Sequence, residues 1–183
     1  MADIRASEIR VIMGHTEWNE DKAKEEFYKV YKVITPSGTK TVSLITHISN
    51  NDSALETAAY VDYRNYLKKD EKLINMFEKL MSYKHFMLVN GTRATVAKGL
   101  ELLGLDPHIF SEIVTSEIVG ETKPSEKGFL YIMKKTGVPA AEHLMIGDRE
   151  DVDLAQARSL GMQTCLVWSK ECPTVYDIVS MLP

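Results

Sequence analysis

The second half of the chain alternates short apolar runs with segments that have the periodicity of helices. The apolar runs are residues 85–89, 113–115, 144–146 and 164–168. The segments between them carry apolar residues at helical spacing: Val96, Leu100 and Leu103; Phe129, Ile132 and Met133; and Leu154, Ala157 and Leu160. Strands that alternate with helices form right-handed β-α-β units, which bring successive strands in parallel. The pattern therefore predicts an α/β fold with an open, mostly parallel sheet.

Size and composition narrow the class of protein further. A chain of 183 residues fits one domain, or a core domain with a small insert. The net charge of −4 does not favour nucleic acid or an anionic membrane as a partner, and no apolar run is long enough to cross a bilayer. Cys165 and Cys172 do not form a C-x-x-C pair, and no signal peptide precedes them, so we expect a reducing, cytoplasmic location.

The first part of the chain has a different, mostly helical pattern. Residues 17–68 are predicted to form a helical insert, in which Ser53 and Glu56 have the spacing of a capping box. Residues 8–13 are predicted to form the first strand of the sheet, because they end in apolar residues and a glycine follows. The expected organisation is a core made of residues 1–16 and 69–183, interrupted by the insert at 17–68.

The N-terminal stretch also has an alternative interpretation. If residues 7–13 form a helix, the sheet lacks its first strand altogether. The centre of the sheet would then be exposed, unless another segment or another chain filled it. Both interpretations stay open at the level of the sequence.

Acidic residues crowd the loop that follows the predicted strand at 144–146. They are Asp148, Glu150, Asp151 and Asp153. Like charges this close destabilise one another unless a cation or a basic side chain lies among them. Because Mg²⁺ binds through one or two carboxylates and retains several waters, Asp148, Asp153 and Asp151 are the candidate metal ligands. The alternative is that Asp148 or Asp151 only caps the helix that follows.

Two further polar sites follow the other predicted strands. Asn90, Gly91 and Thr92 place backbone N–H groups and a hydroxyl at a helix start, which suits an anion and equally suits an ordinary turn. Lys123 is followed by a proline that fixes the backbone, so its ammonium is aimed from a strand end. There it would neutralise a phosphate or the carboxylates of Asp148 and Asp153. Ligands of such sheets bind beyond the carboxyl ends of the strands, where all these residues are expected.

The order of these sites resembles the motifs of the haloacid dehalogenase (HAD) superfamily. MIGDREDVDLAQARSLGM resembles the fourth motif of that family, GETKPSEKGF resembles the third, and FMLVNGTR resembles the second. The resemblance covers residues 70–170. It implies an open, Rossmann-like three-layer α/β core with a small helical cap of the C1 type after the first strand. Among the members of the family, the arrangement is nearest to the phosphatase and nucleotidase group.

The resemblance also implies a chemistry. In the family, an aspartate after the first strand attacks phosphorus, and a second aspartate two residues on acts as acid and base. The second motif and the third-motif lysine, here Lys123, hold the phosphoryl oxygens. Mg²⁺ bridges the nucleophile and the fourth-motif aspartate, here Asp148. Asp153 or Asp151 would hold the ion or its waters.

The first motif breaks this pattern. It reads Asp-x-Asp-x-Thr/Val in the family, and placing Thr16 on its threonine puts Ile12 at the nucleophile and Gly14 at the acid/base. Neither residue carries a carboxylate, so neither can attack phosphorus or transfer a proton. Val89 also stands where the second motif has a serine or threonine. The catalytic nucleophile is therefore not found, and Mg²⁺ binding should be weakened.

Three hypotheses follow from the sequence. The first is a phosphatase-fold protein with lost or much reduced activity, acting as a binding or regulatory protein for a small phosphorylated molecule or an anion. The second is an active Mg²⁺-dependent phosphomonoester hydrolase with a non-standard first motif. The third is a structural partner protein, with a homodimer as one form and the tyrosines Tyr60, Tyr63 and Tyr66 as its contact face.

Overall fold

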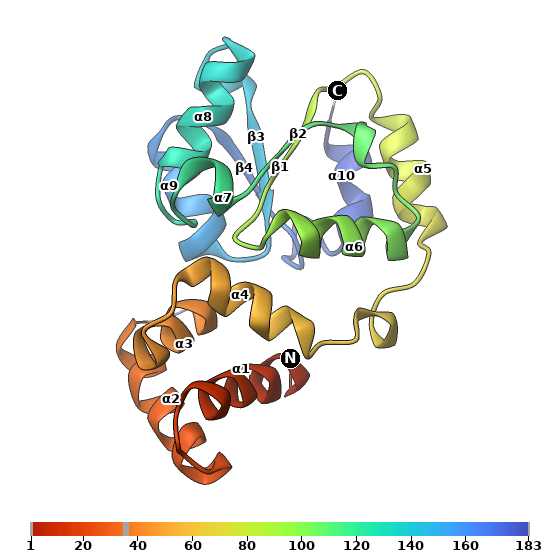
Figure 1. The fold of residues 1–183 in the computed structure, drawn as a ribbon. Coiled ribbons are helices and arrows are strands. Elements are labelled where there is room, and N and C mark those ends of the chain that lie inside the picture. Colours follow the sequence, from red (N-terminus) through yellow and green to blue (C-terminus); the bar gives the residue numbers. More distant parts are fainter. Residues whose placement is uncertain (1, 35–36, 183) are drawn as a thin grey trace. The chain divides into compact units, whose positions relative to one another are not determined.

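The computed structural model of the protein describes residues 2–34 and 37–182. The chain divides into two compact units, of which the first ends at Leu67 and the second begins at Lys68. Figure 1 shows that the first unit is helical and that all the strands lie in the second. None of the helices in the described residues is both long enough and apolar enough to cross a membrane.

The first unit is a group of helices around one apolar core. Its α-helices are α1 (Ala2–His15), α2 (Glu20–Ile34), α3 (Gly38–Thr46) and α4 (Asn50–Ala59), followed by a short 3-10 turn at Tyr63–Asn65. The core is formed by Ile9, Val11, Ile12, Ala23, Phe27 and Val42. Of the tyrosines considered as a contact face, Tyr60 and Tyr66 are exposed, whereas Tyr63 is half-buried.

The prediction of a first strand at residues 8–13 is wrong, because these residues belong to α1. The alternative interpretation, a helix at residues 7–13, is confirmed. Ile12 is fully buried in the core of the first unit, and Gly14 lies exposed in the last turn of the helix. The helix is held by tertiary packing, since Ile12 lies in one cluster with Phe27, and by an ion pair of 2.6 Å between Arg5 and Glu8 one turn apart. The structure thus groups residues 2–16 with the first unit and not with the sheet.

Side-chain caps fix where several helices begin. Asp70 accepts a hydrogen bond from the Leu73 N–H and starts α5 (Glu71–Lys79). The capping box at Ser53 is wrong, because α4 already begins at Asn50 and is capped by Ser49. Ser53 is instead buried within α4 and donates a hydrogen bond to the Thr39 carbonyl of the neighbouring segment.

The second unit follows the predicted alternation of strands and helices. After α5 come β1 (His85–Leu88), α6 (Arg93–Leu103), β2 (Phe110–Val114), α7 (Ser116–Val119), α8 (Lys127–Thr136), β3 (Leu144–Gly147), a π-helical turn (Glu150–Leu154), α9 (Ala155–Ser159), β4 (Gln163–Leu166) and α10 (Ile178–Met181). Short 3-10 turns precede β2, β3 and α10, at Pro107–Ile109, Ala140–Glu142 and Val175–Asp177. Gly104 and Gly137 end α6 and α8 in the left-handed conformation, which glycine adopts without strain.

The strands are parallel, as expected, but in the described residues they form two separate pairs. β1 pairs with β2, with Met87 opposite Ile113 and Leu88 opposite Val114. β3 pairs with β4, with Ile146 opposite Cys165. The pairs lie between α8 and α9 on one side and α5 and α10 on the other (Figure 1). This is a three-layer α/β arrangement whose sheet is interrupted between the two pairs.

Candidate functional site

The sequence-predicted site residues meet around one lysine in the second unit. Asn90 follows β1, and its side-chain amide holds the backbone of Lys123: Oδ1 accepts from the Lys123 N–H at 2.7 Å and Nδ2 donates to the Lys123 carbonyl at 3.0 Å. Two hydrogen bonds from one amide fix both the position and the orientation of the loop that carries the lysine. Asn90 therefore positions Lys123, and both polar atoms of its side chain have a partner.

The Lys123 side chain forms a buried ion pair with Asp153. Its Nζ lies 2.6 Å from Asp153 Oδ1, and the two side chains are 10% and 3% exposed. Burial raises the pKa of the Asp153 carboxyl, but the hydrogen bond and charge of Lys123, with the charge of Arg149, outweigh it, so the pKa lies below its usual value. Asp153 is thus a carboxylate at neutral pH, and Lys123 is its counter-ion.

The turn after β3 brings a second cation to the same carboxylate. The backbone N–H of Arg149 donates to Asp153 Oδ2 at 3.1 Å, and its Nε lies 3.7 Å from the same oxygen. The Arg149 Nε also lies 3.9 Å from Asp148 Oδ1, and the Asp148 side chain is 47% exposed. Gly147 allows this close approach, because a Cβ there would lie 2.4 Å from the Cβ of Asp153.

The remaining acids of the loop lie apart from this group. Asp151 is exposed, and within residues 2–34 and 37–182 no described contact joins it to Lys123 or Asp148. Glu150 forms an exposed ion pair with Arg158, which lies on α9. Of the three predicted metal ligands, the structure therefore brings Asp153 to Lys123, places Asp148 next to Arg149 and leaves Asp151 outside.

The predicted anion site at the start of α6 already has a carboxylate from the same chain. Glu117 Oε2 accepts from the Arg93 N–H at 2.7 Å and from the Thr115 hydroxyl at 3.2 Å. Thr92 is buried and caps α6 by accepting from the Thr95 N–H. Gly91 is open, because a Cβ at that position would meet no atom within 4 Å. Free space for an anion beside this turn is thus at Gly91, not at the helix start.

Val89 extends the ladder of β1. Its N–H donates to the Val114 carbonyl at 3.0 Å, so the residue is held as strand backbone next to Asn90. A valine side chain can offer no hydrogen bond to a phosphoryl oxygen.

The donor set does not form a complete magnesium site on its own. Both oxygens of Asp153 are engaged, one by Lys123 and the other by Arg149, and the half-exposed carboxylate of Asp148 lies 3.9 Å from the Arg149 Nε. Across the described residues, no group of three or more histidine, cysteine, aspartate or glutamate side chains could hold a metal ion. A single half-exposed carboxylate is a weak Mg²⁺ ligand set.

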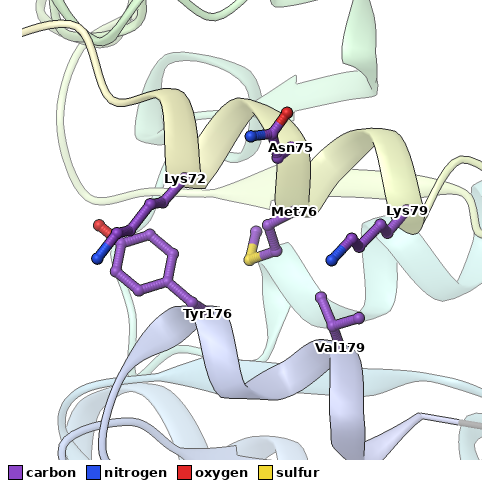
Figure 2. Close-up of a pocket in the computed structure, with 6 residues that line it drawn as sticks. All are labelled: Lys72, Asn75, Met76, Lys79, Tyr176 and Val179. Carbon is purple, nitrogen blue, oxygen red and sulfur yellow. The ribbon is translucent and has the colours of Figure 1, made fainter.

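A cavity of about 270 Å³ lies elsewhere in the second unit, between α5 and the C-terminal helical segment. Figure 2 shows side chains from both segments pointing toward it; its lining consists of Lys72, Asn75, Met76, Lys79, Tyr176 and Val179. The Tyr176 hydroxyl donates to Asp70 Oδ2 at 2.6 Å and so fastens this segment to the start of α5. None of the residues around Lys123 lines this cavity.

Two residues of the site were missed by the sequence analysis. Arg149 binds Asp153 through its backbone, and its position directly after Asp148 was the available signal. Glu117 occupies the start of α6, although it is 24 residues from its partner Arg93, and no sequence spacing indicates that contact.

Comparison with known proteins identifies the family to which this chain is similar. A family model described as haloacid dehalogenase-like hydrolase matches residues 8–167. A glyceraldehyde 3-phosphate phosphatase from Methanopyrus kandleri is 29% identical over 173 residues, covering 88% of this chain and 74% of the relative. One from Methanocaldococcus jannaschii is 36% identical over 86 residues, covering 47% of this chain and 37% of the relative. The match to the latter thus spans little more than a third of its length.

Solved structures show the same fold. A HAD phosphatase from Thermococcus onnurineus has a TM-score of 0.69 at 22% identity, covering 98% of this chain and 89% of that one. A hydrolase from Pseudomonas syringae has a TM-score of 0.60 at 22% identity, covering 91% and 78%. With the parallel α/β architecture and the family match over most of its length, the chain belongs to the haloacid dehalogenase-like hydrolase family.

Proposed function

We propose that this phosphatase-fold chain, acting alone, has lost most or all phosphatase activity and serves as a binding or regulatory protein. One observation carries the proposal: the segment expected to supply the first strand is the helix α1, with Ile12 buried in the other unit. In the part of the chain that the structure describes, no strand precedes β1, so no strand end there offers a carboxylate nucleophile. The proposed reason for a loss of activity also changes: in the described residues Ile12 and Gly14 belong to α1 and not to a strand, so they do not stand in for the two aspartates.

The ligand that fits the remaining groups is a small phosphorylated molecule or another anion. Arg149 is 44% exposed and lies beside Lys123, so an anion has a cation to approach from solvent. Asp153 competes with it for both cations, and Asp148 competes with it for Arg149. Binding should therefore be weak and should weaken further at high salt.

A phosphatase assay with Mg²⁺ tests the proposal. The substrates are a general aryl phosphate and glyceraldehyde 3-phosphate, because curated relatives are named for the latter. Removing a covalent nucleophile lowers the rate of a hydrolase by about 10⁴ to 10⁶. The turnover of the native chain should therefore equal that of the Asp148→Ala variant. Turnover above background that disappears in Asp148→Ala would refute the proposal.

The alternative is an active, Mg²⁺-dependent phosphomonoester hydrolase with a non-standard first motif. It is favoured by the preserved arrangement in which Asn90 positions Lys123 and Lys123 meets Asp153. A phosphoenzyme trapped with a phosphate-mimicking fluoride would support it. The absence of bound metal at millimolar Mg²⁺ would count against it. The homodimer remains a prediction that light scattering would test.

A further inference from the structure

The strands that begin each pair contain no buried residue. In β1 all four residues are half-buried, and β3 has no buried residue, with Ile146 36% exposed. Each partner strand has one buried residue, Val114 in β2 and Cys165 in β4, and one exposed residue at or near its start. In a parallel sheet the inner strands are normally covered on both faces. Partial exposure of apolar strands therefore marks a missing neighbour.

β1 and β3 each use only one edge for hydrogen bonding. The β1 ladder runs to β2 and continues with the bond from the Val89 N–H to the Val114 carbonyl. The β3 ladder runs to β4 and continues with the bond from the Val167 N–H to the Gly147 carbonyl. Within the described residues, no backbone hydrogen bond joins the other edge of either strand to another segment. Each therefore presents a row of unpaired donors and acceptors.

Three contacts bring these two strands into one layer with the same direction. Leu88 of β1 and Met145 of β3 pack against the same cluster around Phe129. On the other face, Phe77 of α5 and Leu144 of β3 pack against the same cluster around Cys165, and the Phe77 ring lies 5.2 Å from that of His85 in β1. At the carboxyl ends, Lys123 bonds to Asn90, which follows β1, and to Asp153, which follows β3.

The residues of β1 and β3 indicate what kind of segment can pair with their free edges. The residues beside them are apolar, namely Phe86, Met87, Leu88, Met145 and Ile146. Each strand has four residues, so the occupant needs only a short extended segment, parallel to both. A second copy of this chain is a poor occupant of the space between β1 and β3. The strands of its described residues already form pairs, and a pair is two strands wide where one strand is needed. A single apolar strand can satisfy both edges at once.

We propose that the unpaired edges of β1 and β3 form a binding site for one parallel strand from a partner polypeptide, an extended apolar segment that joins the two pairs into one sheet. The proposal concerns an interaction surface and does not depend on whether the chain hydrolyses phosphate. The inserted strand would end beside Lys123 and Asp148, so the partner would also supply the residues that face the candidate site.

Hydrogen exchange with an added strand peptide tests the proposal. The probe is acetyl-Lys-Val-Ile-Val-Phe-Lys-amide, used at concentrations where light scattering shows it to be monomeric. At saturation, exchange in residues 85–89 and 144–147 should slow by about fivefold or more, because amides on both edges gain a partner. The control is acetyl-Lys-Val-Pro-Val-Pro-Lys-amide, whose prolines remove the donors of a strand, and it should protect neither segment.

A matched pair of variants locates the binding. Ile146→Lys places a charge beside the free edge of β3 and should abolish the protection. Leu130→Lys changes a residue of similar exposure, 41%, on α8 and should leave the protection intact. No protection by the strand peptide, protection of one segment alone, or equal protection by the proline peptide would overturn the proposal. A dimer with both segments already protected would overturn it too, because the occupant would then be a second copy.

Discussion

The two units of this chain differ in how completely their apolar residues are buried. In the helical unit, Ile12, Ala23, Phe27 and Val42 have no exposed surface at all. In the α/β unit, the apolar residues of β1 and β3 remain partly exposed, and Ile146 reaches 36%. Both units draw on apolar residues of similar kinds, so composition does not explain the difference.

The difference arises from how each kind of element satisfies its backbone. A helix pairs its own N–H and C=O groups, so a helical unit needs no further backbone partner once the apolar faces of its helices pack together. A strand depends on its neighbours, and one absent strand leaves two unpaired edges and exposes apolar side chains on both flanking strands. We therefore expect core substitutions to be costly in the first unit and at the buried ion pair, and mild at the strand edges.

The largest effect is expected for Phe27→Ala in the first unit. Phe27 is fully buried, and its ring stacks on Tyr31 with centroids 5.5 Å apart. Its loss should lower the free energy of unfolding of that unit by about 3 to 5 kcal/mol, because a large cavity remains. Urea unfolding followed by Trp18 fluorescence, in a Trp168→Phe background, reports on this unit because Trp18 packs against its core.

The neighbouring residue supplies the control for this experiment. Tyr28 is 41% exposed, so Tyr28→Ala should cost about 1 kcal/mol or less. Equal losses for Phe27→Ala and Tyr28→Ala would show that the helical core is not closed in solution.

The next largest effect is expected for Lys123→Met in the second unit. The variant leaves the Asp153 carboxylate buried without its counter-ion, which should cost about 3 kcal/mol at neutral pH. Hydrogen exchange of residues 144–154 measures the loss. Arg158→Met, which breaks an exposed pair with Glu150, is the matched control and should cost less than about 1 kcal/mol.

The pH dependence of this effect has a definite sign. The pKa of Asp153 is held below its usual value, so the ion pair stabilises the protein fully above the pKa of an unfolded aspartate, about 3.9. That stabilisation is lost as the pH falls through the lower pKa of the folded state. The difference between the native protein and Lys123→Met should therefore shrink on acidification, and a difference that grows would contradict the assignment.

The sequence predicted the second unit well because its signals are local. Periodic apolar residues indicated the helices, and the turn at Asn90, Gly91 and Thr92 indicated where one of them starts. The parallel pairing followed from the alternation of strands and helices. The interruption between the pairs matches the alternative interpretation, in which residues 7–13 form a helix and the sheet lacks its first strand.

The sequence left the N-terminal segment open between a strand and a helix for a physical reason. Residues 8–13 end in apolar residues followed by a glycine, which suits a strand, but the same residues also fit a helix face. Packing of Ile9 and Ile12 against Phe27 decides between them, and that contact is tertiary. In the site, the meeting of Lys123 with Asp153 was foreseen, whereas the roles of Arg149 and Glu117 depend on contacts that spacing does not reveal.

A smaller loss is expected for Asn90→Ala. The variant removes both hydrogen bonds that hold the Lys123 backbone, at a cost of about 1 to 2 kcal/mol. Asn90→Asp keeps the acceptor for the Lys123 N–H and loses the donor, so it should fall between the native protein and the alanine variant. Faster hydrogen exchange in residues 120–125 would report the loosened loop, and unchanged exchange there would show that the loop is held by other contacts.

The smallest effect is expected for Ile146→Ala at the open edge of β3. Ile146 already has 36% of its surface in water, so the variant should lower stability by about 1 kcal/mol or less. Ile132→Ala removes the same atoms from a site 9% exposed on α8 and should cost about 2 kcal/mol or more. Saturation with the strand peptide should bring the two losses closer together, because an inserted strand would cover Ile146. If the peptide left the gap between these variants unchanged, the exposure of Ile146 would be a permanent feature of the fold and not a vacant contact.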